Sequence, residues 1–230
     1  MGFRDLDFAI SDSSRLVKYA GIVLCGGRSR RMGVPKWALP FGPEPMLRRV
    51  ARLLAQAADE VIVVAAPNQT LPDLAAPVRL VHDRWEGRGP LEGLRAGLAA
   101  LSPGCQAAYA TGCDAPLLAP AFVRRMFELL GDDEIAVPDS GGHAHPLSAA
   151  YRCSVLPAID RLLAADRLRM TDLFESVPTR KVLPRELLDI DPELATLRNF
   201  NSPAEYREAV TQAGFEVPAN VLAELASQQQ

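Results

Sequence analysis

One stretch near the start of the chain constrains the fold more than any other, because an apolar run there ends in paired glycines and a strongly basic loop. The run Gly21–Cys25 has no alternation of polar and apolar residues and is closed by Gly26 and Gly27. Continuous apolar runs of this kind are typical of strands buried in a parallel sheet. The loop after such a strand lies at the carboxyl edge of the sheet, where open α/β folds bind ligands. We therefore expect a ligand site directly after Cys25.

The loop after the glycines concentrates positive charge, with Arg28, Arg30, Arg31 and Lys36 close together. The glycines let the backbone approach a ligand that side chains would keep away. Guanidinium and ammonium groups supply the countercharge that a triphosphate needs. The spacing excludes a Walker A loop, because no Ser or Thr follows Lys36, and an arginine at the second glycine position excludes G-x-G-x-x-G. A solvated basic loop without a ligand is the alternative.

The rest of the chain alternates between apolar runs and segments of helical periodicity. This alternation predicts an α/β fold with a mainly parallel central sheet that is covered by helices on both faces. Residues 1–18 precede the first strand and are expected to form an N-terminal extension, and residues 19–230 suit a single domain. We expect the later strands at 61–66, 78–81, 106–111, 134–138, 148–151 and 179–183.

Composition excludes several classes of protein. A net charge of −3 gives no bulk attraction to nucleic acid, and 48% hydrophobic with 23% charged residues is ordinary for a globular protein. The four cysteines contain no C-x-x-C pair, which argues against a zinc site or a disulfide framework and favours a reducing compartment. We found no signal peptide and no apolar run that fits a membrane span, so we expect a cytoplasmic protein without nucleic-acid or membrane partners.

Two acidic residues follow expected strands, and the second of them suits a metal ion. Asp83 follows the strand at 78–81, and Gly89 precedes a helix that Pro90 begins, so free N–H groups face the same edge. Asp114 follows the strand at 106–111 and is held by the turn at Pro116. Mg²⁺ prefers one or two carboxylates together with substrate phosphate oxygens. Both aspartates are also common turn residues, and that interpretation stays open.

Two asparagines lie at comparable places. Asn68 follows the strand at 61–66, where it suits contact with a base or ribose, although an Asn in a turn is often only a local backbone partner. Asn201 precedes a helix whose start is marked by Ser202, Pro203 and Glu205, a capping-box pattern. The side chain of Asn201 is then left outside the helix. An Asn before a helix is common, so a role for it stays open.

Other charged residues are interpreted as structural. Arg48, Arg49 and Arg52 fall opposite the apolar face of the helix near 46–58, which is typical of a solvated helix surface rather than of a phosphate site. His143 and His145 have no Cys, Asp or Glu at a spacing that completes a metal site, and we do not expect a general base there.

The stretch Leu24–Lys36 resembles the signature L-x-G-G-x-S-x-R-M-G-x-x-K of the nucleotidyltransferases that build the molybdenum cofactor, and the match is best to the molybdenum cofactor guanylyltransferase family. Residues 83–93, 114–116 and 201–203 are similar to further segments of that family. The resemblance covers about residues 18–213 and implies a three-layer, Rossmann-like nucleotidyltransferase fold. Such an enzyme transfers GMP from GTP to the terminal phosphate of molybdenum-bound molybdopterin, with release of pyrophosphate, to form the molybdopterin guanine dinucleotide cofactor.

The resemblance also implies roles for particular residues. The glycine pair favours GTP over CTP, and Mg²⁺ is the expected cofactor, with Asp114 as its ligand and Asn201 as a second ligand or as a contact to phosphate. The attacking phosphate is already an anion, so no Ser–His or Cys–His pair is required. The implied catalytic residues are Arg31, Lys36 and Asp114. The implied GTP-binding residues are Leu24, Gly26, Gly27, Arg28, Lys36, Asn68, Asp83, Gly89 and Asp114.

Three other functions remain open at this point. One is a related transferase that uses CTP, and another acts on a sugar phosphate or an alditol phosphate. The third is a non-catalytic module that binds a nucleotide or a partner without turnover that depends on Mg²⁺. Proteins that deliver or accept the molybdenum cofactor are further expected partners of the enzyme.

Overall fold

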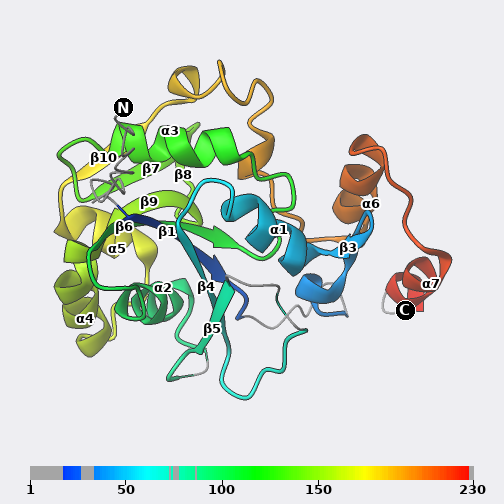
Figure 1. Ribbon diagram of the computed structural model, residues 1–230, viewed down its shortest axis with the longest axis horizontal. Helices are drawn as coiled ribbons and strands as arrows, with labels where there is room; N and C mark the ends of the chain where they lie inside the picture. Colours follow the sequence, from blue (N-terminus) through cyan, green and yellow to red (C-terminus); the bar gives the residue numbers. More distant parts are fainter. Residues whose placement is uncertain (1–17, 27–33, 73, 75–77, 86, 228–230) are drawn as a thin grey trace, which may run out of the picture.

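The computed structural model describes residues 18–26, 34–72, 74, 78–85 and 87–227, and Figure 1 shows their arrangement around a twisted central sheet. The sheet has eight strands, of which seven form a continuous path in the order β10-β7-β9-β6-β1-β4-β5, and β8 pairs with β7 beside it. The strands of this sheet are β1 (Lys18–Leu24), β4 (Glu60–Ala65), β5 (Val78–His82), β6 (Cys105–Gly112), β7 (Ile135–Ser140), β8 (His143–Ala144), β9 (Ser148–Arg152) and β10 (Thr179–Val182).

The central sheet is mainly parallel, which confirms the fold class that the sequence predicts. The pairs β1–β6, β1–β4, β4–β5 and β7–β10 are parallel, whereas β9 runs antiparallel between β6 and β7. The first apolar run becomes β1 at the centre of the parallel part, and Ile22 and Val23 are fully buried in it. Burial from both faces explains why the run has no polar alternation.

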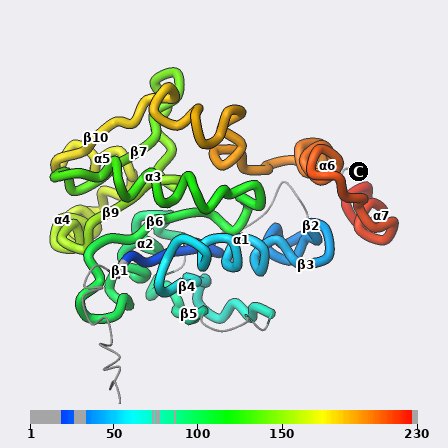
Figure 2. The backbone as a smooth tube through the Cα atoms, turned by 45° about the horizontal axis from the view of Figure 1, so that its top comes forward, coloured from blue at the N-terminus to red at the C-terminus, as the bar shows by residue number. Residues whose placement is uncertain are grey.

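Helices cover both faces of the sheet and form two separate cores. On one face, α2 (Pro90–Ala99), α4 (Leu156–Ala164) and α5 (Met170–Ser176) pack their apolar sides against the strands. On the other face, α1 (Met46–Leu54) and α3 (Pro120–Leu130) do the same. The result is a three-layer α/β/α arrangement, which can be followed in Figures 1 and 2. Among the described residues, no helix combines the length and the apolar character needed to cross a membrane.

The parallel strands end together, and this alignment positions the loops that follow them. The register pairs Leu24 of β1 with Val64 of β4 and with Gly112 of β6, and it pairs Ala65 with His82 of β5. Parallel strands place their carboxyl ends at one edge of a sheet, so segments far apart in the sequence meet there. The loops after β1, β4, β5 and β6 therefore share one edge.

The C-terminal part of the chain forms a third core cluster beside the sheet. It comprises α6 (Pro203–Gln212), α7 (Ala219–Ser227) and the hairpin of β2 (Pro40–Phe41) and β3 (Glu44–Pro45). Figures 1 and 2 both show α6 and α7, in orange and red, at the same side of the molecule as this hairpin. Buried side chains from both segments, among them Phe41, Phe200 and Tyr206, pack together. This contact brings the segment before α6 to the end of the basic loop.

Candidate functional site

A cavity of about 970 Å³ opens at the carboxyl edge of the parallel strands. Its volume falls within the roughly 300–1,000 Å³ typical of small-molecule sites. The loops after β1, β4, β5 and β6 line it, together with the 3₁₀ helix η1 (Lys36–Ala38) and the first turns of α2. Of the residues that the sequence analysis selected, those that line it are Leu24, Gly26, Lys36, Asn68, Asp83, Gly89 and Asp114.

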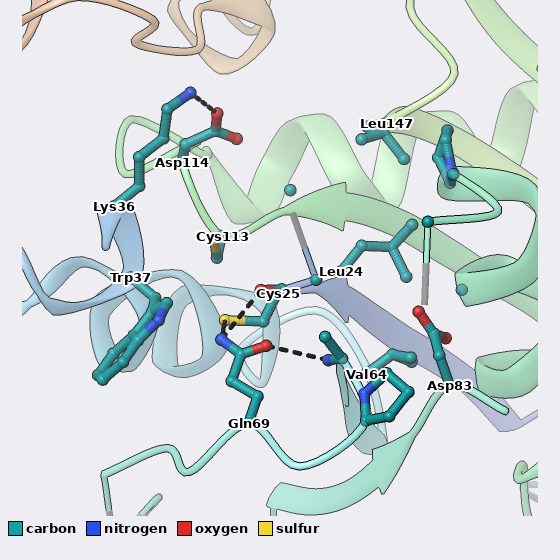
Figure 3. A pocket seen from close by; sticks show the side chains of 18 of the residues that line it. Leu24, Cys25, Lys36, Trp37, Val64, Gln69, Asp83, Cys113, Asp114 and Leu147 are labelled. Atoms are coloured by element: carbon teal, nitrogen blue, oxygen red, sulfur yellow. Dashed lines mark hydrogen bonds and ion pairs between the residues drawn. The ribbon is translucent and has the colours of Figure 1, made fainter. Parts of the chain in front are cut away.

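Three polar side chains from distant parts of the sequence meet at one end of this cavity. The Lys36 ammonium donates to Asp114 Oδ2 at 2.8 Å and to Asn201 Oδ1 at 2.9 Å. Figure 3 shows the Lys36–Asp114 ion pair at the rim, well separated from Asp83 on the opposite side. The side chains of Lys36 and Asp114 are 17% and 18% exposed, so the pair is partly shielded but open to a ligand. The structure thus brings together three residues that the sequence analysis placed in separate loops.

Local structure determines where each of these three side chains points. Pro35 is extended and precedes η1, which carries Lys36. Asp114 turns back over the end of β6, and a Cβ on Gly112 would lie 2.5 Å from its Oδ1, so a side chain there would displace the carboxylate. Asn201 is held because its N–H donates to the Glu205 carboxylate at 2.8 Å, while Ser202 caps α6.

The donor set around Lys36 suits a hard divalent cation. A carboxylate oxygen and an amide oxygen both point at a single cationic group, the Lys36 ammonium. Oxygen donors are the ligands that Mg²⁺ prefers, and Mg²⁺ usually takes only one or two carboxylates and completes its shell with phosphate oxygens and water. No group of three or more His, Cys, Asp or Glu side chains in the described part of the chain is arranged to hold a metal by itself. The residues present therefore fit a metal that arrives with a phosphate ligand.

Asp83 marks the other end of the cavity and lies in an unusual environment for a carboxyl group. Its N–H continues the sheet by donating to Ala65 O at 2.9 Å, and its Oδ1 is buried without a hydrogen-bond partner among the described residues. Burial, and next the nearby Glu92, raise the pKa of Asp83 to about 6, against an opposing effect of His82. A buried acceptor that lacks a donor costs stability and is ready to bind a ligand's N–H or O–H group.

The raised pKa of Asp83 predicts a pH-dependent effect of Asp83→Asn on stability. Between about pH 4 and pH 6 the folded state keeps the Asp83 proton and the unfolded state loses it, so this carboxyl contributes less stability as the pH rises through 6. We expect the difference between the melting temperatures of Asp83→Asn and the wild type to shift in favour of the variant between pH 4 and pH 7. Above pH 7 this difference should stay constant. Thermal unfolding of both proteins across this range measures the difference, and a constant difference would contradict the assigned environment.

The remaining selected residues divide into those that lie in the cavity wall and those that the structure does not describe. Gly26 is exposed beside Asp83, and a Cβ there would lie 3.4 Å from Asp83 Oδ2. Gly89 has a φ of 76° and precedes α2 with open space around it, as expected for a close approach. Asn68 adopts a left-handed conformation with a φ of 62° in the loop after β4. Gly27, Arg28 and Arg31 lie outside the described residues.

Several cavity residues were not identified from the sequence. Gln69 accepts from Ala66 N at 2.9 Å and donates to Cys25 O at 3.3 Å, so it ties the loops after β4 and β1 together, as Figure 3 shows. The thiol of Cys113 contacts that of Cys25, and hydrogen bonding to Cys25 and then burial raise the pKa of Cys113. All four cysteines are free thiols. No sequence spacing marks these contacts, because they depend on the register of neighbouring strands.

His145, directly after β8, makes polar contacts with β7. His145 Nε2 lies 2.7 Å from Ser140 Oγ, and the backbone N–H of His145 donates to Pro138 O at 2.8 Å. Burial lowers the pKa of His145, and this outweighs the opposing effect of Asp139. The imidazole therefore holds the β7–β8 turn.

Comparison with known proteins places these features in context. The family model for the MobA-like NTP transferase domain matches residues 21–179. A probable molybdenum cofactor guanylyltransferase from Mycobacterium avium is 35% identical over 209 residues, which cover 89% of this chain and 99% of that protein. A protein of the same name from Pelotomaculum thermopropionicum is 33% identical over 198 residues, with 84% and 93% covered.

A solved structure has the same fold. The crystal structure of molybdopterin-guanine dinucleotide biosynthesis protein A from Archaeoglobus fulgidus superimposes with a TM-score of 0.73 at 19% identity, and the match covers 85% of this chain and 98% of that one. The segment matched by the family model contains every loop that lines the cavity, from Leu24 to Leu147.

Proposed function

The chain belongs to the family of MobA-like NTP transferases, and we propose that it transfers GMP from GTP to the terminal phosphate of molybdenum-bound molybdopterin, with release of pyrophosphate. The names of its relatives, which match along most of the chain, support this reaction. The observation that carries the proposal is the meeting of Lys36, Asp114 and Asn201 at one end of a cavity that has an unpartnered carboxylate oxygen at the other. Such a cavity suits a ligand with anionic groups at one end and N–H donors at the other.

In this proposal the phosphates bind at the Lys36 end. The Lys36 ammonium neutralises charge on the triphosphate, and Asp114 and Asn201 hold Mg²⁺ beside it. When bound, the metal polarises the phosphate oxygens and neutralises the charge that develops on the leaving pyrophosphate. Arg28 and Arg31, in the loop between Gly26 and Val34, are proposed to add positive charge at the same end. The reaction then depends mainly on positioning and charge neutralisation.

The base binds at the Asp83 end in the same proposal. Guanine carries N–H donors on N1 and N2, and the carboxylate of Asp83 accepts both when it is ionised. The pKa of about 6 leaves Asp83 mostly ionised at neutral pH. Gly26 lies beside this carboxyl group without a side chain of its own, which lets a flat ring approach the carboxylate. Cytosine has only one amino group and no second N–H beside it. The two oxygens of the Asp83 carboxylate therefore support binding of GTP over CTP.

The acceptor phosphate needs little activation from the protein. A phosphate monoester is already an anion at neutral pH, so it attacks the α-phosphorus without a general base. This agrees with the role of His145, which holds a turn and is absent from the cavity wall. The protein's contribution is to hold the two reacting phosphates in line and to reduce their mutual repulsion.

We also propose a cytoplasmic setting, with proteins that deliver or accept the molybdenum cofactor as partners. The four free thiols suit a reducing compartment, since thiols close to one another persist where disulfides are kept reduced. We treat residues 19–230 as the catalytic unit.

The decisive experiment supplies the purified protein with GTP, Mg²⁺ and molybdenum-bound molybdopterin, and follows both pyrophosphate and the dinucleotide product. Formation of both products supports the proposed reaction. Pyrophosphate release with a sugar phosphate or alditol phosphate acceptor instead would replace the proposed acceptor. GTP binding without any turnover would identify a non-catalytic module.

A nucleotide comparison tests the assignment of the base. We expect kcat/KM for GTP to exceed that for CTP by at least about tenfold, because paired hydrogen bonds to a base contribute about 1–3 kcal/mol of discrimination. Asp83→Asn should reduce this ratio, since an amide offers one acceptor where the carboxylate offers two. Asp166→Asn, at an exposed position in the turn after α4, is the matched control. A ratio near one in the wild type would overturn the choice of GTP.

A further inference from the structure

Arg49 departs from the solvated helix face to which the sequence assigns it. Its side chain is only 20% exposed, whereas that of Arg52, one turn later on α1, is 49% exposed. Arg52 pairs with Glu44 at 2.6 Å, but the nearest Glu44 oxygen is 3.9 Å from Arg49. Arg49 therefore has only a weak ion pair, and its other contacts explain its position.

The first of these contacts reaches the turn that carries Asp114. Arg49 Nε donates to Pro116 O at 2.8 Å, a hydrogen bond between α1 and a loop 67 residues away in the sequence. Pro116 lies two residues after Asp114 in the tight turn that follows β6. A charged donor to a backbone carbonyl forms a stronger hydrogen bond than a neutral donor does. Arg49 thus fixes the turn from the side of α1.

The second set of contacts reaches the segment that carries Asn201. The Arg49 guanidinium lies over the rings of Phe41 and Phe215, at 5.0 Å and 5.8 Å from their centroids. Phe41 also stacks on Phe200, with 6.4 Å between centroids. Phe200 is buried and immediately precedes Asn201. We call Phe41, Phe200 and Phe215 the aromatic cluster.

We propose that Arg49 is a positioning residue that holds Asp114 and Asn201 in register around Lys36. The hydrogen bond to Pro116 orients the turn of Asp114, and the stacking on the aromatic cluster orients the segment of Asn201. This inference rests on the proposed function, in which Asp114 and Asn201 bind the metal. Arg49 itself touches neither the nucleotide nor the metal.

The chemistry of arginine suits both contacts at once. Its planar guanidinium stacks on aromatic faces while its Nε–H still donates in the plane. A lysine keeps the charge but has no planar group, so it cannot keep both contacts. Phe215 packs directly on the backbone at Gly42, where an added Cβ would lie 2.8 Å from its ring. Arg49→Lys therefore separates positioning from charge.

The test measures metal binding rather than turnover. Mn²⁺ is titrated into the full chain with GTP but without acceptor, and free Mn²⁺ is followed by electron paramagnetic resonance. We expect Arg49→Lys to raise the Mn²⁺ dissociation constant about tenfold, as is usual when a residue that orients metal ligands is replaced. Phe215→Leu, which removes the ring from the other side, should weaken Mn²⁺ binding as well. Binding of GMP without metal, which depends on the Asp83 end, should stay within about twofold.

Arg52→Lys is the matched control, since it changes the neighbouring arginine that pairs with the same glutamate. Its Mn²⁺ affinity should equal that of the wild type. An unchanged Mn²⁺ affinity in Arg49→Lys, or an equal loss in Arg52→Lys, would overturn the proposal. If Arg49→Lys unfolds below the assay temperature, the test rests on Phe215→Leu. Wild-type Mn²⁺ affinity in that variant refutes the inference. A failure of the proposed function gives a different result, because the wild-type protein itself would then show no turnover of GTP.

Discussion

Asp114→Asn is expected to lower kcat/KM for GTP by about a thousandfold while the protein stays folded. The substitution keeps the size of the side chain and an oxygen that can accept from Lys36, but it removes the negative charge that a divalent ion requires. Loss of electrostatic stabilisation at one group in an active site costs about a hundredfold to a thousandfold in rate, and here the metal is weakened with it. Asp114 is partly exposed and lies at the cavity rim, so little packing is lost.

Pyrophosphate release under saturating Mg²⁺ measures the loss of activity, and a thermal melt shows whether the variant stays folded. Asp189→Asn is a suitable control, because it neutralises an aspartate whose side chain is 59% exposed and pairs with Arg125 away from the cavity. We expect that control to retain wild-type activity. Activity within twofold of wild type in Asp114→Asn would exclude this carboxylate as the metal ligand.

Lys36→Met is expected to reduce kcat/KM for GTP by about a hundredfold. Methionine preserves the length and apolar stem of the side chain but removes the charge that is proposed to bind the triphosphate. The change also leaves Asp114 and Asn201 without the ammonium that now joins them. Removing a positioned cationic donor at a transferring phosphoryl group costs on the order of several kcal/mol of transition-state stabilisation.

Kinetics with GTP and with the acceptor varied in turn show where the loss occurs. We expect the larger effect when GTP is varied, since Lys36 is assigned to the triphosphate. Lys181→Met supplies the comparison, because Lys181 is 68% exposed and its ion pair with Asp139, at 3.2 Å, is not part of the cavity wall. Wild-type kinetics in Lys36→Met would remove the assigned role.

Much of the candidate site was predictable because the loops that follow parallel strands all lie at the same edge of the sheet. Once the run Gly21–Cys25 is identified as a buried strand, the loop after it must lie at the carboxyl edge. The same reasoning applies to Asp83 and Asp114, which follow β5 and β6 directly. Periodicity also located these helices, whereas the structure shows that α1 and α3 pack on one face of the sheet and α2 and α4 on the other.

Asn201 shows the limit of that reasoning. The capping pattern of Ser202 and Glu205 predicted the start of α6, and the structure confirms that Ser202 caps the helix. It did not predict that Asn201 accepts from Lys36, 165 residues earlier in the chain. That contact depends on how the aromatic cluster docks the C-terminal helices against the β2–β3 hairpin.

Arg49 and the thiol pair are the clearest cases in which sequence reasoning was wrong or silent. Helical periodicity places Arg49 opposite the apolar face, yet the C-terminal segment covers that side and packs Phe215 on it. Cys25 and Cys113 appear scattered in the sequence, but they follow Leu24 and Gly112, which are paired in the sheet.

The sequence by itself determined the α/β class, the strand whose loop opens the site, and the residue types available for phosphate, metal and base. Those properties follow from local patterns, namely continuous apolar runs, helical spacing and the residues that come directly after each strand. Only the tertiary structure decided which of these side chains meet, and that Arg49 joins the Asp114 turn to the Asn201 segment. The physical reason is that strand register and the docking of the C-terminal helices arise from packing between residues far apart in the chain, which no local pattern records.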